Sequence, residues 1–118
     1  MTAQIVNEFG IIRIDNEVVA RVAGLTAMDC YGVVGMGAKS VKDGLIHLLK
    51  RESLTKGIHV NIQGNTLTID IHIIVEYGTN IAAIADSLIQ NVIYKVKEFV
   101  GLDVSLVNVY VVGIRVEE

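Results

Sequence analysis

The 118-residue sequence has no proline and no tryptophan, a single cysteine, Cys30, and only 5% aromatic residues. One cysteine excludes an internal disulfide and a zinc site built on paired thiolates. The absence of proline, of charge runs and of low-complexity tracts removes the usual signs of a linker or a disordered tail. We therefore expect one domain over residues 1–118, located in the reducing environment of the cytoplasm.

Charge is also scarce, since charged residues make up 19% of the chain, with 13 acidic against 10 basic residues. The net charge of −3 gives no general positive field for nucleic acid or anionic lipid. No apolar stretch approaches the roughly 20 residues that a membrane helix needs, so we expect no direct membrane insertion. A surface of such low charge is typical of one that meets a partner. A well-filled core under small surface residues is the alternative explanation.

The first half of the chain predicts a strand, a helix, a glycine loop and a second helix. Phe9–Ile14 is apolar and β-branched, and Asp15 offers a side-chain oxygen that caps the following helix. Three glycines between residues 29 and 39 break the helical pattern and indicate a loop, with or without a short extended piece. A spacing that resembles a capping box at Ser40 starts the second helix, which runs to about residue 52.

Residues 58–73 give the clearest local prediction. Apolar and polar residues alternate on both sides of a Gly-Asn pair at 64–65, which is the pattern of a hairpin with a two-residue turn. Such a turn sets Ile58 opposite Ile71 and places the alternate apolar side chains on one face. We expect that face to be buried against helices.

The last part of the chain predicts a long helix and a β-rich segment. Asn80 caps this helix, its apolar residues fall in one arc that ends at Phe99, and Gly101 stops it. Over residues 102–116 the apolar pattern changes phase, which indicates a strand covered on both faces or bulged near Leu106. Together these elements predict an α+β fold, with a mixed or antiparallel sheet of about four strands and two or three helices packed on one face.

Side chains able to carry chemistry are few. His59, Asp70 and His72 project from the polar face of the hairpin, with His59 opposite Asp70. A further metal ligand is missing, so we interpret them as a solvated cross-strand pair rather than a zinc site. Cys30 has no recognisable histidine base and is interpreted as a small buried side chain. We therefore expect no catalytic residue, no metal site and no cofactor.

An alternative function comes from the glycines of the predicted loop. Gly32 and Gly35 form a GXXG pattern ahead of a hairpin and a helix, an element order found in KH-type RNA-binding modules, and Lys39 and Lys42 follow it. A backbone-clamping loop usually places polar or basic residues between its glycines, whereas this one has two valines in an acidic chain. A structural turn is therefore the favoured interpretation, and nucleic acid is not the expected partner.

Six segments of the chain carry a family resemblance: Gly10–Ile14, Val18–Ala20, Tyr31–Val33, Gly57–Val60, Ile73–Gly78 and Val107–Ile114. Together they resemble the alkaline shock (Gls-type) family, envelope stress response proteins of Gram-positive bacteria. The resemblance implies a cytoplasmic protein linked to envelope stress or housekeeping, without catalysis, that in some members is held at the membrane through a membrane-anchored partner. It carries over no catalytic residues, and the lack of long charged extensions favours the shorter housekeeping branch.

These observations predict a non-catalytic scaffold that self-associates or docks on a membrane-anchored protein partner. The candidate contact surface is the edge of the hairpin and the apolar last strand, the latter through Val107, Val109, Tyr110, Val111 and Val112. An exposed strand can pair with its equivalent in a second copy, and the commonest closed result is a two-fold homo-oligomer.

Overall fold

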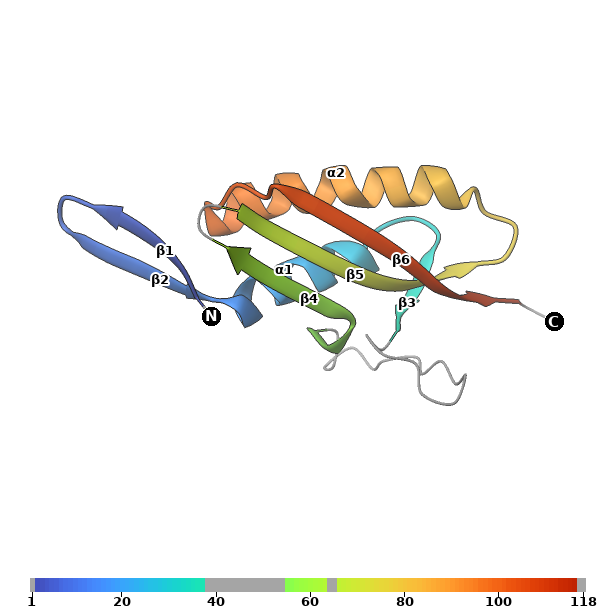
Figure 1. Cartoon of the computed structure of the whole chain (residues 1–118). Coiled ribbons are helices and arrows are strands. Elements are labelled where there is room, and N and C mark those ends of the chain that lie inside the picture. The colour runs from blue at the N-terminus through green and yellow to red at the C-terminus, as the bar shows by residue number, and fades with distance from the viewer. Residues whose placement is uncertain (1, 38–54, 64–65, 117–118) are drawn as a thin grey trace.

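The computed structural model of the chain describes residues 2–37, 55–63 and 66–116. In chain order its elements are β1 (Thr2–Asn7), β2 (Gly10–Asp15), α1 (Asn16–Met28), β3 (Val33–Met36), β4 (Ile58–Gln63), β5 (Thr66–Glu76), α2 (Ile81–Val100) and β6 (Leu106–Arg115) (Figure 1). The α+β class is confirmed. The main sheet has four strands, and β1 and β2 form a separate two-stranded sheet that adds to the expected number.

Strand β5 is the centre of the main sheet. Strand β6 runs parallel to it along one edge, opposite Thr68–Glu76. The other edge of β5 is shared end to end, because β4 pairs antiparallel with residues 66–71 and β3 pairs antiparallel with residues 73–75. Since α2 connects β5 to β6, these elements form a parallel crossover unit. The sheet is mixed, as the sequence predicts.

The predicted hairpin register is confirmed. Ile58 lies opposite Ile71 and His59 lies opposite Asp70, and the pairing continues to the end of both strands. The apolar residues of this register are buried or half-buried on the face that the helices cover. The Gly-Asn pair at 64–65 and the second predicted helix, from Ser40 to about residue 52, lie outside the described residues.

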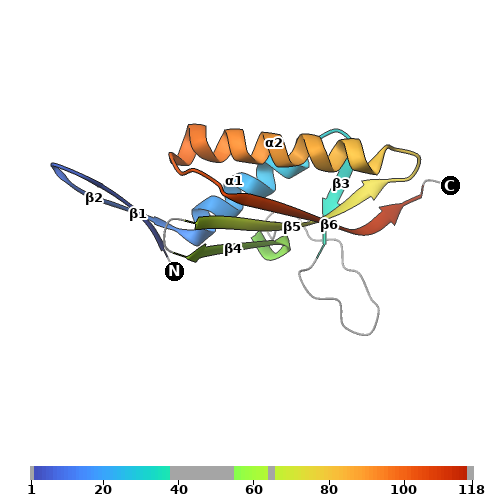
Figure 2. The same cartoon turned by 45° about the horizontal axis from the view of Figure 1, so that its top comes forward.

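Both helices begin and end where the sequence predicts. The Asp15 carboxylate accepts a hydrogen bond from the Glu17 backbone N–H at 3.1 Å, and the Asn80 side chain accepts one from the Ala83 N–H at 3.1 Å. Gly101 ends α2 in the left-handed conformation, with φ +83°. The helices lie on the same side of the sheet (Figure 2). Between the two layers lies the core, whose fully buried side chains include Val19, Met36, Ile69, Ile71, Ile73, Val75, Leu88, Val92 and Val96.

Two sequence predictions need correction. Phe99 belongs to the apolar arc of α2, yet 66% of its surface is exposed, because its ring lies over the space between α1 and α2 instead of over the sheet. The irregularity in β6 is not near Leu106, where the strand begins, but at Val112. There the register shifts between Ile73 and Ile74 of β5, and this bulge accounts for the change of apolar phase late in the strand.

The first two strands form a hairpin that projects from the body of the molecule (Figures 1 and 2). We call residues 2–15 the N-terminal arm. Strand β2 agrees with the expected strand, but its partner β1 was not predicted from the sequence. The arm contributes to an elongated shape, with extents of 58 × 29 × 22 Å.

Candidate functional site

Strand β6 leaves its outer edge unpaired in the part of the chain that the structure describes. Edge strands normally protect themselves with proline, charge or bulges. Strand β6 contains no proline, its one charged residue is Arg115 at its end, and its bulge at Val112 lies towards the same end. The stretch from Leu106 to Val111 therefore offers unprotected main-chain donors and acceptors.

The candidate contact residues of β6 do not all lie on the surface. Val107, Val109 and Val111 stand opposite Ile69, Ile71 and Ile73, so their side chains point towards the helices, and Val107 is only 5% exposed. Val112 is half-buried at the bulge and Tyr110 is 46% exposed. The edge thus exposes its backbone and Tyr110, while Val107, Val109 and Val111 pack towards the core.

On the face of the sheet away from the helices, His72 is not the solvated side chain that the sequence predicted. Its ring is buried, because it stacks on Tyr110 with 4.9 Å between ring centroids and its Nδ1 lies 3.0 Å from the Gly57 carbonyl oxygen. Beside it, Asn108 donates a hydrogen bond of 2.9 Å to the Asp70 carboxylate. Residues 2–37, 55–63 and 66–116 contain no group of three histidine, cysteine or acidic side chains arranged to hold a metal ion.

Cys30 is buried, as predicted. Its Sγ lies 4.0 Å from the Ile84 carbonyl oxygen, and only 8% of the residue is exposed. Burial raises the pKa of the Cys30 thiol, although a hydrogen bond with Ser87 acts in the opposite direction. A buried thiol with a raised pKa is a poor nucleophile, because the thiolate is the reactive form.

The glycines of the RNA-binding alternative do not form an exposed loop. Gly32, with φ +88°, makes the turn before β3, and its carbonyl accepts a 2.9 Å hydrogen bond from the Glu76 N–H. Gly35 is buried within β3, and Val33 is 8% exposed. Lys39 and Lys42 lie outside the described residues. The exposed loop that a KH-type clamp requires is therefore not present at these glycines.

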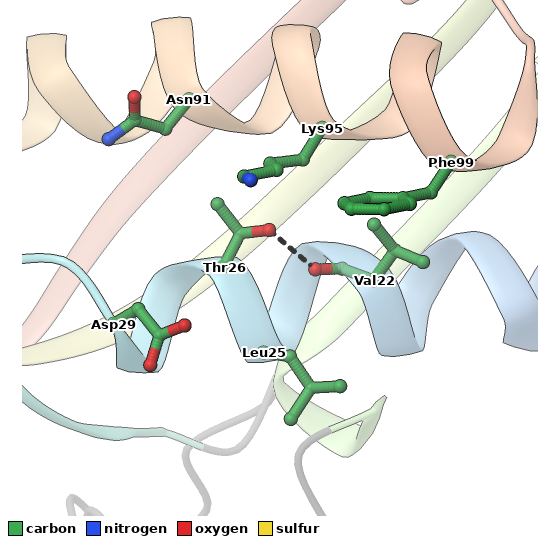
Figure 3. A pocket seen from close by; sticks show the side chains of 7 residues that line it. All are labelled: Val22, Leu25, Thr26, Asp29, Asn91, Lys95 and Phe99. Carbon is green, nitrogen blue, oxygen red and sulfur yellow. Dashed lines mark hydrogen bonds between the residues drawn. The ribbon is translucent and has the colours of Figure 1, made fainter.

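A groove between the two helices is a feature that the sequence did not reveal (Figure 3). We call it the helix groove; its volume is about 370 Å³, and its lining residues are Val22, Leu25, Thr26, Asp29, Asn91, Lys95 and Phe99. Lys95 reaches over the Phe99 ring, with Nζ 5.2 Å from the centroid. The groove thus combines an apolar floor with one carboxylate and one ammonium group. A signal in the sequence was Phe99, an aromatic residue placed at the very end of the apolar arc of α2.

A comparison with models of protein families shows which family the chain belongs to. Residues 4–116 match the model of the alkaline shock protein 23 family, described as having a cell envelope-related function. The chain belongs to the alkaline shock protein family. This confirms the resemblance carried by the segments quoted from the sequence, and it assigns the family to an envelope-related and stress-related context.

Relatives in two organisms support the assignment. The chain is 44% identical over 117 residues to the uncharacterized protein YloU of Bacillus subtilis, covering 98% of each chain. It is 33% identical to the uncharacterized protein Spy1614 of Streptococcus pyogenes, covering 98% of this chain and 97% of the relative. It is also 30% identical to a Streptococcus pyogenes protein named stress response regulator gls24 homolog, of which it spans 61%.

Among solved structures, a zinc form of the MamM CTD aligns with a TM-score of 0.48 and 16% identity, covering 87% of both chains. That similarity is too low to support an argument about function. Within the described part of this alkaline shock protein, neither α1 nor α2 is long and apolar enough to cross a membrane.

Proposed function

We propose that this alkaline shock protein is a non-catalytic interaction module of the cell envelope that self-associates by pairing its β6 edge with β6 of a second copy. The observation that carries the proposal is the unprotected outer edge from Leu106 to Val111. Two identical strands that pair antiparallel about a two-fold axis satisfy the backbone groups of both edges. The sheets of two copies then join into one sheet across the interface.

The side chains around this edge suit such a pairing. Leu106 and Ile114, near the two ends of β6, are 53% and 52% exposed, and Tyr110 between them is 46% exposed. Apolar cross-strand contacts and a buried aromatic ring stabilise an added strand. A strand donated by a membrane-anchored protein fits the same edge, and it would link the envelope context of the family to the same surface.

The test introduces like charges along the edge. The double variant Leu106→Lys and Ile114→Lys places lysines on both copies, and their repulsion opposes antiparallel pairing. Both residues are more than half exposed, so the fold keeps its core. We expect the apparent molar mass, followed by light scattering across a concentration series, to fall from that of a dimer or larger assembly to that of the monomer.

The control variant is Tyr31→Lys and Tyr94→Lys, which adds the same charge at two sites that are 86% and 63% exposed and belong to other segments, the turn before β3 and helix α2. It should associate like the unmodified protein. A strict monomer before any substitution, or an equal loss of association in the control, would falsify the proposal.

A further inference from the structure

The N-terminal arm exposes more apolar surface than a two-stranded hairpin tolerates in water. Phe9 at its tip is 91% exposed, Val6 is 66% exposed, and Ile11 and Ile12 are 55% and 47% exposed. An isolated hairpin of two strands is marginally stable at best, and it needs a packed face to persist. One face of the arm has such contact, since the Ile5 side chain reaches the helix end near Gly101. The tip and the opposite face, with Phe9, Val6 and Ile11, are largely exposed among the described residues.

The chain cannot cover this surface with its own helices. Strand β2 ends at Asp15, Asp15 is itself the N-cap of α1, and α1 begins at Asn16. No residue is left between strand and helix to act as a hinge, so the arm continues outward from α1 (Figure 1). Folding the tip back onto the outer surface of α1 and α2 of the same molecule would require breaking this junction. Since neither helix of the described residues can cover the tip, a second molecule is a candidate cover.

The helix groove has the complementary chemistry. Its apolar lining, Val22, Leu25 and Phe99, matches the apolar tip, and it presents one positive and one negative side chain, Lys95 and Asp29. In the described part of the chain, ion pairs join Lys97 to Asp103 and Arg115 to Glu76, and neither involves a charge of the groove.

The arm carries the opposite charges. Glu8 precedes Phe9 in the turn, and Arg13 shares a face with Val6 and Ile11, because alternate strand residues point the same way. Glu8 and Arg13 likewise form no ion pair in the described residues. With Glu8 of the tip next to Lys95, and Arg13 further along the arm near Asp29, two ion pairs form. Each of the four charges then has a partner of opposite sign.

We propose that the N-terminal arm of one copy docks in the helix groove of a second copy. Phe9 enters beside Phe99 and Leu25, and Glu8 pairs with Lys95. This contact uses surfaces other than the β6 edge, and it holds whether or not the two β6 strands pair. Because the arm and the groove are different surfaces, the contact closes a dimer if it is reciprocal and extends a chain of molecules if it is not.

A lipid surface is the competing cover for an exposed apolar tip. The charge at the tip opposes it, because Glu8 adjoins Phe9 and the whole chain carries −3, whereas bacterial and other anionic membrane surfaces attract basic segments. The structure thus favours a protein groove with its own lysine, and vesicle binding becomes an outcome of the test.

The first test is a cross-link between two single-cysteine proteins of different mass, both carrying Cys30→Ala. One carries Gly10→Cys, a position next to Phe9 where an added Cβ meets nothing within 4 Å. The other carries Leu25→Cys, in the groove beside the proposed position of Phe9. We expect mixed disulfides to form at least about tenfold faster than with Tyr31→Cys, an 86% exposed site outside the groove. Equal rates for the two partners overturn the proposal.

The second test exchanges the charges. Glu8→Lys and Lys95→Glu should each weaken association by about threefold, the range of an exposed ion pair, and the double variant should restore it. Repeating the cross-link in the Leu106→Lys and Ile114→Lys background separates this contact from the β6 edge, since it should persist there. Vesicles of phosphatidylglycerol and phosphatidylethanolamine test the lipid alternative. If the unmodified protein binds them, Phe9→Asp does not, and no arm-to-groove cross-link forms, then the tip contacts lipid and the docking is refuted.

Discussion

At the scale of single residues, His72 shows how a local pattern misleads. Its place in the alternating pattern puts it on the polar face, and its pairing with Tyr110 of β6 keeps it there. Burial comes from residues distant in the sequence, because the Gly57 carbonyl and the Tyr110 ring close over it. Alternation predicts which side of a sheet a residue faces, but not whether another segment covers that side.

Gly57 is a residue whose small size the packing requires. A Cβ built there would lie 2.6 Å from the Gly37 carbonyl oxygen, a backbone atom that cannot move aside cheaply. We expect Gly57→Ala to lower the free energy of unfolding by about 1–3 kcal/mol, the range of overpacked sites. Urea denaturation followed by circular dichroism measures this change.

The matched control is Gly10→Ala, because a Cβ at Gly10 meets nothing within 4 Å. Its midpoint in urea should match that of the unmodified protein. If the two variants unfold at the same urea concentration, the close approach of Gly57 to Gly37 does not limit the stability of the fold.

At the scale of elements, local signals were sufficient for both helices and for one hairpin. Asp15, Asn80 and Gly101 predicted helix ends because caps satisfy backbone groups within a few residues. The β4–β5 register followed from the two-residue turn. Strand β1 was missed because apolar and polar residues alternate only weakly over Thr2–Asn7. Only Glu8 and Phe9 separate β1 from its partner β2.

The difference between a buried and an exposed position on the helices is testable with one chemical change. Leu88 of α2 has no exposed surface, whereas Leu25 of α1 is 41% exposed at the helix groove. We expect Leu88→Ala to cost about 2–5 kcal/mol of stability because it leaves a cavity in the core. Leu25→Ala should cost well under half as much. Thermal and urea unfolding of both variants provide the comparison, and similar losses would contradict the assignment of the core.

At the scale of the whole molecule, the sequence predicted the layers and the β4–β5 pair, but not the other strand neighbours. An α+β sandwich with helices on one face follows from the buried stripes of the elements. The parallel pairing of β6 with β5, and the sharing of one edge by β3 and β4, depend on contacts between distant segments. The helix groove was missed for the same reason, because it exists only once Val22 of α1 lies against Phe99 of α2.

The projecting arm gives the molecule a measurable shape. The radius of gyration is 14.9 Å, against about 13.5 Å for a compact domain of this length. We expect small-angle scattering of the dilute monomer to give the larger value. Amide hydrogens of the arm should exchange rapidly there and become protected at high concentration, when docking covers the tip. Protection that does not depend on concentration would mean that the arm is stable without a partner.

The position of β5 between strands from three other parts of the chain sets an order on folding during synthesis. When β5 has left the ribosome, β4 and β3 can already occupy one of its edges, because they precede it. Its other edge stays open until α2 and then residues 106–115 have been made. The newly made chain therefore displays an apolar strand, including Ile69, Ile71 and Ile73, for the whole time that α2 is being translated, and a chaperone or a neighbouring nascent chain has that interval in which to bind it.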